Sequence, residues 1–496
     1  MKAGRELPTL FQYGEEWTSR WLSASAHLDE EFARATAIEL TEDRIRALGP
    51  SLGVDLVAVA RHTRLAVRRT NLRDGLLAVL FTAGAGYLAV LVHGILAGPV
   101  EASLGRSLLG LVGVLAASWG LVLVVEHRAR VLALKVIALG GPPPEGLAPP
   151  LDPGLEERLR EQERANVAPY HEDAERTNPF VGSGERFQER VWHPIDISKP
   201  ANASGGGKLS IIPFDVLDLH AFVEQEMGNI AGLEGLRAAH RLYVRGPMTL
   251  HAGKDLLPDR LRPPRAVIPE DMVQAGLARP GLGMRTYLCL ERVGDSGRVI
   301  VCMHLRARLQ HPSLTWEVAA YVVPPLRDSF MRVRTLRLDP FGRWWTLFTF
   351  TTGAFLPLLF KVPARLLRRA WDKFLRRWDL GYARWVIGKR HIEYDYGATG
   401  SIRAEAAEEL EHIEFSDSTD ALDFLQRLQR GVLTATEQFL KAHHVDTRSF
   451  DQAQRVITHH SYTFQGPING PGIYGDHGTF NLPGGAPSPS PEPTKP

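Results

Sequence analysis

The amino-acid sequence predicts an α+β membrane protein, in which a transmembrane α-helical hairpin carries a large cytoplasmic α+β domain with an antiparallel β-meander. Two uncharged apolar runs predict the hairpin, and alternating apolar and polar residues between about 286 and 325 predict the meander. The chain has 496 residues, 44% of them hydrophobic and 23% charged, which is the composition of a folded protein. Its formal net charge of +2 argues against a general nucleic-acid binder, so no nucleic-acid partner is expected.

Residues 1–74 are the first predicted unit, an N-terminal cytoplasmic helical segment. Trp17, Trp21 and Leu22 recur at helical spacing, which is typical of an amphipathic helix. The opening residues lack the apolar core of a signal peptide. We therefore expect no cleavage there, and the hairpin that follows is the predicted anchor.

The helical hairpin is predicted over residues 75–125, with spans of about 75–98 and 107–125. Gly75–Val100 and Ser107–Val125 contain no Asp, Glu, Lys or Arg, and each is long enough as a helix to cross a hydrocarbon core of ~30 Å. Buried core helices are the alternative, but two such runs so close together favour spans. The absence of charged residues inside both runs argues against a channel or pump.

The distribution of basic residues predicts the orientation of the hairpin. Arginines cluster before the first span and basic residues follow the second, whereas the connecting turn contains only Arg106. The positive-inside rule therefore predicts a multi-pass protein of the bacterial plasma membrane with both termini in the cytoplasm. Small residues four positions apart, such as Gly113 and Ala117, allow close helix packing within the hairpin or between copies in a homo-oligomer.

Residues 126–155 form a basic exit and a Pro-rich linker, and residues 156–340 form the predicted cytoplasmic α+β domain. Residues 215–243 show helical spacing, whereas the alternating runs after residue 286 predict antiparallel strands. The second run has an apolar and a polar set, Val299, Val301, Met303 and Leu305 against His304, Arg306 and Arg308. This alternation predicts a sheet with one packed face and one wet face.

The two cysteines test the register of these strands. If Gly294–Gly297 is the whole loop between the first two strands, Cys289 lies directly opposite Cys302. Directly opposed cysteines are close enough for a strained disulfide. In a reducing cytoplasm we predict two free thiols instead.

Residues 341–390 are predicted to associate with the membrane as a hydrophobic segment followed by a basic amphipathic helix. Trp344–Phe360 is uncharged, and we expect it to dip into the membrane or lie on it, with burial in the soluble domain as the alternative. A third complete span is disfavoured, because it would carry the arginine-rich stretch after Lys361 to the outside.

The basic amphipathic helix begins at Lys361 and includes Trp378. Aromatic and aliphatic residues share one of its faces, and basic residues occupy most of the other. Such a helix suits a membrane surface rich in anionic lipid, and packing on its own domain is the alternative. The lipid-facing or partner-binding candidates are Arg368, Arg369, Trp371, Phe374, Arg376, Arg377 and Trp378.

Residues 391–481 are predicted to be a helical region with a Gly-rich end, and residues 482–496 a disordered tail. Five histidines occur late in the chain, at His443, His444, His459, His460 and His477. Their spacing is not that of a zinc site, so we interpret them as surface residues and expect no metal or other cofactor.

Several sequence blocks resemble recurring blocks of an uncharacterised family of two-span membrane proteins from high-GC Gram-positive (actinobacterial) bacteria. The blocks are GPSLGVDLVAVARH (49–62), NPFVGSG (178–184), RTYLCLERV (285–293), EVAAYVVPPLRD (317–328) and YGATGSIRAE (396–405). The resemblance extends from the first helices to the C-terminal QFLKAHHVDT. It implies a plasma-membrane protein with a cytoplasmic domain, and it carries no activity or site residue over to this chain.

Two short motifs resemble known catalytic or nucleotide-binding motifs without matching them. NPFVGSG places Ser183 between glycines but lacks the G-x-S-x-G of a hydrolase elbow. We interpret it as a tight buried turn, with an anion-binding nest at Gly182 and Gly184 as the alternative. GGGKLS (205–210) lacks the glycine and hydroxyl positions of a phosphate-binding loop.

The sequence therefore predicts a membrane-anchored cytoplasmic scaffold, regulatory or assembly module that contacts anionic lipid and an unidentified protein or second copy. It shows no recognised catalytic constellation, so enzymatic activity is left open and is not favoured. The alternative is a membrane-tethered cytoplasmic enzyme such as a hydrolase. That alternative requires Ser183, Glu185 and either His193 or His220 to converge on one pocket.

Overall fold

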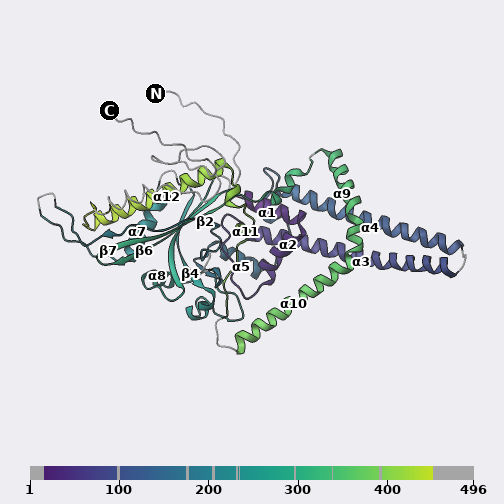
Figure 1. The fold of residues 1–496 in the computed structure, drawn as a ribbon, viewed down its shortest axis with the longest axis horizontal. Helices are drawn as coiled ribbons and strands as arrows, with labels where there is room; N and C mark the ends of the chain where they lie inside the picture. The colour runs from purple at the N-terminus through teal and green to yellow at the C-terminus, as the bar shows by residue number, and fades with distance from the viewer. Residues whose placement is uncertain are drawn as a thin grey trace, which may run out of the picture.

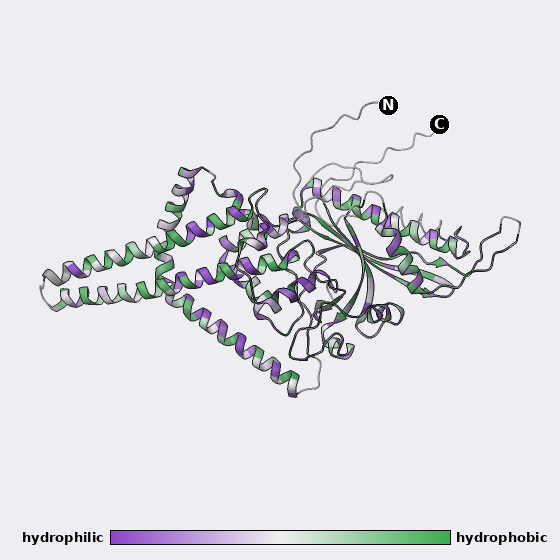
Figure 2. Cartoon of the chain, turned by 180° about the vertical axis from the view of Figure 1, so that it is seen from behind, coloured by the Kyte–Doolittle hydropathy of each residue, from purple (hydrophilic) through white to green (hydrophobic). Residues whose placement is uncertain are grey.

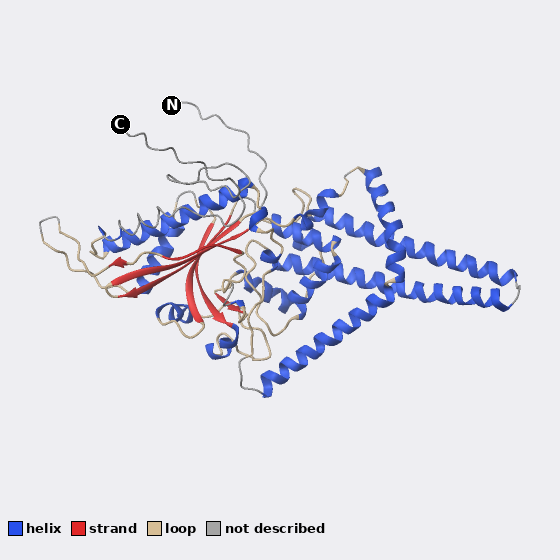
Figure 3. Cartoon of the chain, viewed as in Figure 1, coloured by secondary structure: helices blue, strands red, loops and turns tan. Residues whose placement is uncertain are grey.

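The computed structural model of the chain describes residues 16–450 except 98–100, 175–177, 204–206, 231–232, 234, 295–297, 338, 390–393 and 449. The Gly-rich end, the predicted tail and three of the late histidines (His459, His460 and His477) lie outside the described residues. Figures 1 and 3 show a long helical hairpin, a helical unit at its base, and a sheet with its own helices beyond that unit.

The N-terminal third of the chain forms the helical unit and the hairpin. Its elements are α1 (Trp17–Leu28), α2 (Glu30–Ala37), η1 (Ile38–Glu42), α3 (Leu56–Ala97), α4 (Glu101–Val136), η2 (Pro144–Leu147) and α5 (Pro153–Glu163). Trp21 and Leu22 of α1 share a buried core with Leu56 and Val57 of α3. The first turns of α3 are therefore part of the helical unit, and only the remainder of the helix projects from it.

The projecting parts of α3 and α4 are exposed and apolar. Both helices are long and apolar enough to cross a membrane, over Leu56–Leu96 and Gly105–Val136. Figure 2 shows the outer part of the hairpin as mostly hydrophobic, and side chains such as Leu88 and Leu109 are exposed there. An exposed apolar surface of this extent suggests association with a membrane.

The sheet is mixed and has seven strands. Its strands are β1 (Val167–Tyr170), β2 (Glu185–Val191), β3 (Ile195–Asp196), β4 (Leu236–Arg245), β5 (Met284–Val293), β6 (Ile300–Gln310) and β7 (Ser313–Val323). The strand order is β1-β4-β5-β6-β7-β2, with β3 also pairing to β7. Only β1 and β4 pair in parallel, and the other pairs are antiparallel. With the helices around it, this sheet confirms the α+β class.

One face of the sheet is covered by α7 (Val216–Gly228) and α12 (Phe415–Ala442), as Figure 1 shows. The apolar set of β6, including Val301, Met303 and Leu305, lies in this core as predicted. The helical prediction for 215–243 is correct for α7 and wrong beyond it, because residues from Leu236 onward form β4. There the strand pairs with β5 along its whole length, and this pairing outweighs local helical spacing.

On the other face of the sheet, the predicted exposure is correct for Arg308 and wrong for His304 and Arg306. His304 is fully buried and Arg306 is nearly so, because Phe180, Tyr243 and Tyr321 pack with the cysteines over this face. Polar residues in a strand thus mark a second, more polar core here. Alternation of apolar and polar residues in a strand shows only that the two faces of the sheet differ. It cannot show that residues from elsewhere in the chain cover the polar face.

The predicted opposition of Cys289 and Cys302 is wrong. Cys289 pairs with His304, and Cys302 pairs with Glu291. The loop is longer than Gly294–Gly297, because the pairing of β5 with β6 ends at Val293 and Ile300. Both cysteines are free and buried, and both belong to the same core cluster.

The remaining elements are α8 (Glu270–Ala278), α9 (Pro340–Phe360), α10 (Val362–Lys389), α11 (Ile402–Glu405) and the short turns η3 (Gly246–Ala252), η5 (Asp328–Thr335) and η6 (Leu410–His412). In Figures 1 and 3, α9 crosses the hairpin near its base and α10 leaves obliquely toward the side of the helical unit. The two helices meet at a bend of 63°, and they satisfy the length and composition of a span only as a pair.

Candidate functional site

The candidate site lies where α9 and α10 meet the base of the hairpin. α10 contains the predicted amphipathic helix, and its early arginines contact acidic residues of α2 and α3. Arg369 Nη2 donates to Glu30 Oε1 at 2.5 Å and also pairs with Asp74, and Arg365 Nη2 lies 3.3 Å from Asp74 Oδ1. These contacts fix the start of α10 against the helical unit.

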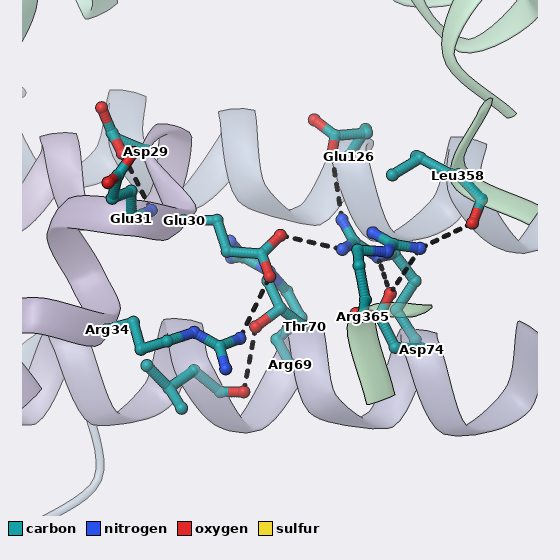
Figure 4. A network of polar contacts seen from close by, with 12 residues as sticks. Asp29, Glu30, Glu31, Arg34, Arg69, Thr70, Asp74, Glu126, Leu358 and Arg365 are labelled. Atoms are coloured by element: carbon teal, nitrogen blue, oxygen red, sulfur yellow. Dashed lines mark hydrogen bonds and ion pairs between the residues drawn. The ribbon is translucent and has the colours of Figure 1, made fainter. Parts of the chain in front are cut away.

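Asp74 is at the centre of this group and its side chain is fully buried. Its neighbour Arg73 donates from Nε to Asp74 Oδ1 at 2.9 Å and from Nη2 to Glu30 Oε2 at 2.9 Å. Figure 4 shows these contacts between the helices, with Arg365 also donating to the Leu358 carbonyl. We call Glu30, Arg73, Asp74, Arg365 and Arg369 the hairpin-base cluster.

The electrostatics of the hairpin-base cluster favour the ionised form of Glu30. Burial raises the pKa of Glu30, but the guanidinium groups of Arg73 and Arg369 outweigh this effect and lower the pKa below its usual value. Glu30 is therefore a carboxylate at neutral pH. Removing either member of a buried ion pair leaves an unpaired charge, so the carboxylate of Glu30 holds α10 in place only while its arginine partners are present.

The sequence-predicted residues of α10 divide into two groups. Arg369 is in the hairpin-base cluster, and Arg376 pairs with Glu42 of η1 at 3.2 Å. Arg368 and Arg377 are exposed. The three predicted aromatic residues, Trp371, Phe374 and Trp378, are also exposed.

These aromatic residues form a continuous surface. The ring centroids of Trp371 and Phe374 are 5.6 Å apart, and those of Phe374 and Trp378 are 6.3 Å apart. Tyr382 and Trp385 extend the exposed row, with centroids 6.0 Å apart. We call these five residues the aromatic ridge. Sequence reasoning found its first three members, and it missed the last two because it ended the helix at Trp378.

A cavity of about 580 Å³ lies between the middle of α10 and η1. Its wall combines charged residues such as Glu42 and Arg376 with apolar ones such as Leu380 and Ala383. Tyr382 belongs to both the cavity and the aromatic ridge, so the two surfaces are continuous. The arrangement can bind an amphipathic segment of a partner molecule.

α9 packs across the hairpin through aromatic contacts. Trp344 stacks on His127 of α4 with ring centroids 5.2 Å apart, and Trp119 Nε1 donates to Thr352 Oγ1 at 3.3 Å. Nearer its end, Leu359 is buried with Leu77 of α3. Other aromatic residues of α9, including Trp345, Phe348 and Phe360, are exposed.

A second polar group lies inside the sheet. Ser183 Oγ is 2.8 Å from His304 Nε2. His304 Nδ1 is 3.3 Å from Cys289 Sγ and 3.4 Å from the Tyr243 hydroxyl. We call these four residues the sheet cluster. Phe180 covers the imidazole, with ring centroids 4.2 Å apart.

The sheet cluster is sealed from solvent and uncharged. Burial lowers the pKa of His304 well below its usual value and raises the pKa of Cys289 to about 12. Beside them Arg241 Nη2 donates to Glu291 Oε2 at 3.3 Å within a buried ion pair. Ser183 is only 2% exposed, so the serine and its histidine meet without room for a substrate.

The other residues required by the hydrolase alternative do not converge with Ser183. His220 lies on the opposite core, where its Nε2 accepts from the Ala307 amide at 3.0 Å. Glu185 Oε1 accepts from the Leu410 amide at 3.3 Å, and His193 is exposed. The true partner, His304, is 121 residues from Ser183 and carries no local signal.

The turn that carries Ser183 is tight and buried, as predicted. Gly182 and Gly184 have φ values of +89° and +86°, which residues other than glycine rarely adopt. A Cβ atom at Gly182 would lie 2.1 Å from the Pro50 carbonyl oxygen. Close packing against Pro50 at Gly182 and against Val322 at Gly184 therefore explains these glycines, and the anion nest is not needed to account for them.

Within the described part of the chain, no group of three or more His, Cys, Asp or Glu side chains is arranged to hold a metal ion. His443 Nδ1 and His444 Nδ1 each lie within hydrogen-bonding distance of a backbone carbonyl, at Phe439 and Ser210.

Comparison with known proteins gives one match. A family model described as an AbeC-like domain matches residues 191–479, which is more than half of the chain. The match begins after the hairpin and includes α9, α10 and α12. None of the curated proteins and none of the solved structures matches the chain.

Proposed function

The chain belongs to the AbeC-like domain family, and from this premise and the geometry above we propose that it is a membrane-anchored cytoplasmic scaffold or assembly module. In this proposal α3 and α4 span the bacterial plasma membrane with both termini in the cytoplasm. α9 and the first turns of α10 contact anionic lipid, and the aromatic ridge binds a partner. The family description names a domain and assigns no reaction to it.

The exposed aromatic ridge is the observation that carries the proposal. Five aromatic side chains on one helix are exposed, with Trp371 at 59% and Trp378 at 65%. Exposed aromatic surface of this kind is typical of a binding interface or a membrane surface. The arginines on the inner side of α10 hold this surface outward by pairing with Glu30, Asp74 and Glu42.

The direction in which α10 runs assigns lipid to one end of the aromatic ridge and the protein partner to the other. α10 starts beside α9 at the hairpin and runs obliquely away from it (Figure 1). Trp371 and the exposed Arg368 therefore lie nearer to the bilayer than Trp385 does. Near an anionic surface each arginine contributes about 1 kcal/mol to binding. The far half of the ridge, with the neighbouring cavity, remains for a protein partner or a second copy.

Two aromatic substitutions test the proposal in the full-length protein. The double variant Trp378→Ala and Trp385→Ala should lose the partner or self-association that the wild type retains after solubilisation in a mild neutral detergent. Phe415→Ala, which removes an exposed aromatic residue at the start of α12, should keep it. Size-exclusion chromatography with light scattering gives the mass of each species. A wild type that is monomeric and without partner would contradict the proposal.

Membrane placement has its own test. Alkaline phosphatase fused at residue 103 should be active, and the same fusion at residue 200 or at the C-terminus should be inactive. Activity at residue 200 would place the sheet outside the cytoplasm and refute the orientation.

The alternative function, a membrane-tethered hydrolase, has one supporting observation. Ser183 Oγ and His304 Nε2 are at the distance expected of a nucleophile and its base. The closed surroundings of this pair weigh against the alternative, since catalysis needs a site for the reacting group.

A further inference from the structure

A small basic cavity lies between α4 and the start of α9, apart from the aromatic ridge. Its volume is about 120 Å³, which is room for several water molecules. Arg130, Arg337 and Arg343 line it together with His127. A tetrahedral phosphate group fits a space of this size, and its charge matches this lining.

The positive charge of the cavity is only partly neutralised within the chain. Asp339 lies 3.2 Å from Arg337 Nε and also accepts from the Gly342 amide at the start of α9. Among the described residues, neither Arg130 nor Arg343 forms an ion pair with a carboxylate. Arg130 instead lies over the Phe350 ring, 5.1 Å from its centroid. Glu126, four residues earlier on α4, acts on Arg130 electrostatically but forms no direct ion pair with it, so the guanidinium groups of Arg130 and Arg343 can still bind an anion directly.

The walls of the cavity suit a molecule with a charged head and an apolar body. Trp344 stacks on His127 at one side, and Leu134 and Leu347 form apolar walls. Tryptophan residues concentrate at the boundary between hydrocarbon and headgroups, and Trp344 and the adjacent Trp345 are both exposed. The cavity therefore presents basic groups beside an apolar surface.

The position of the cavity along α4 matches the depth of lipid headgroups. The apolar run of α4 ends at Val125, and His127 and Arg130 follow within about one and a half turns. If α4 spans the membrane as proposed above, these side chains lie at the cytoplasmic headgroups. Basic pockets between membrane helices at this level bind phosphate-containing headgroups.

We propose that this cavity binds the phosphate group of one anionic phospholipid of the cytoplasmic leaflet. Arg130 and Arg343 hold the phosphate, Arg337 and His127 border it, and the acyl chains lie along the hairpin. The choice of a lipid over free phosphate rests on the proposed membrane placement of α4. The site is separate from the aromatic ridge and does not require a partner protein.

Native mass spectrometry of the full-length protein in a neutral detergent tests this proposal. With phosphatidylglycerol added, the wild type should retain one lipid more tightly than it retains phosphatidylcholine. The variant Arg130→Gln with Arg343→Gln should bind phosphatidylglycerol about 25-fold more weakly, at roughly fivefold for each arginine. Equal binding by this variant and the wild type would overturn the proposal.

A matched control removes two arginines that do not line the cavity. Arg128 is exposed on α4 one residue from His127, and Arg332 is exposed on η5. The variant Arg128→Gln with Arg332→Gln should bind phosphatidylglycerol as the wild type does. An equal loss in this control would show general charge attraction and overturn the specific site. The single variant Arg343→Lys should keep most of the binding, which guards against misfolding as the cause of a loss.

One further measurement identifies the source of the phosphate group. A second distinguishes failure of this inference from failure of the proposed function. Inorganic phosphate at millimolar concentration should not displace the lipid, and displacement would assign the site to a soluble phosphate compound instead. Extraction of cell membranes with alkaline carbonate reports insertion of the hairpin independently. Release of the protein would refute the proposed function, whereas retention together with unchanged lipid binding in Arg130→Gln/Arg343→Gln would refute only this inference.

Discussion

The hairpin-base cluster and the sheet cluster are both buried polar groups, but they are built differently. The sheet cluster and the adjoining Arg241–Glu291 pair leave no buried side-chain nitrogen or oxygen without a partner among the described residues. In the hairpin-base cluster, Arg365 Nε and Arg369 Nη1 lack a partner. The first group belongs to one sheet and its covering turn, whereas the second joins three separate helices, α2, α3 and α10.

Because of this difference, the two groups differ in how easily their contacts can change. A fully satisfied network inside a sheet opens only when the sheet opens, so it stabilises one conformation. An ionic group between helices can exchange one anion for another at a smaller structural cost. We therefore interpret the sheet cluster as structural and the hairpin-base cluster as the adjustable joint between α10 and the hairpin.

The largest expected effect comes from breaking the ion pair beside the sheet cluster. Arg241→Met leaves Glu291 buried without its partner, which should lower the free energy of unfolding by about 3–5 kcal/mol. Chemical denaturation of the full-length protein in detergent measures this loss. The double variant Arg241→Met with Glu291→Leu should recover most of it, because no charge then remains buried. A single variant as stable as the wild type would show that the pair is hydrated in solution.

Asp74→Asn should have a smaller and local effect. It leaves Arg365 without a carboxylate and Arg369 with only Glu30, while Arg73 keeps Glu30 and Glu126, so α10 should detach more often, by about 2 kcal/mol. Hydrogen exchange in α10 should become roughly 30-fold faster while exchange in β5 and β6 is unchanged. Asp379→Asn, which removes an exposed acidic residue of α10 itself, is the control. Faster exchange in the sheet as well would contradict the independence of the two groups.

Ser183→Ala should cost about 1 kcal/mol, the value of one buried hydrogen bond. Thermal unfolding measures it. A fluorophosphonate probe should not label Ser183 in the wild type, because the serine is sealed. Labelling of Ser183 that disappears in Ser183→Ala would revive the hydrolase alternative and remove the contrast between the two clusters.

An effect no larger than that of Ser183→Ala concerns pH and Glu39 of η1. Burial, together with the nearby carboxylates of Glu405 and Asp43, raises the pKa of Glu39 to about 7. A raised carboxyl pKa penalises the folded state once the side chain ionises, so this penalty grows from about pH 4.5 to pH 7 and is complete above. Acidification from pH 8 to pH 6 should therefore stabilise the wild type by about 1 kcal/mol relative to Glu39→Gln. Denaturation curves of both proteins at the two pH values measure this difference, and equal pH responses would contradict it.

The sequence was informative where one pattern decides the outcome. Uninterrupted apolar residues predicted α3 and α4, and alternation in β6 correctly placed Val301, Met303 and Leu305 on a packed face. These patterns are local, so neighbouring residues are sufficient to read them.

The site depended on contacts that no local pattern contains. Ser183 meets His304 across 121 residues, and Arg369 meets Glu30 across 339. The pairing of Arg369 and Arg376 with Glu30 and Glu42 could not be predicted from the basic face of α10, because these acidic partners lie near the other end of the chain. The cysteine register failed for a related reason, because it depended on a loop length that only the pairing of β5 with β6 determines.

The link between Arg369 and Glu30 also sets an order of events during synthesis. The two residues are 339 positions apart, so at 5–20 residues per second the ribosome needs roughly 20–70 s to pass from one to the other. The second helix of the hairpin ends at Val136, so both hairpin helices have been synthesised well before Arg369 is made, and until then Asp74 and Glu30 have only basic neighbours from the N-terminal helices. Synthesis of the hairpin therefore precedes the docking of α10, so α10 packs onto helices that already exist.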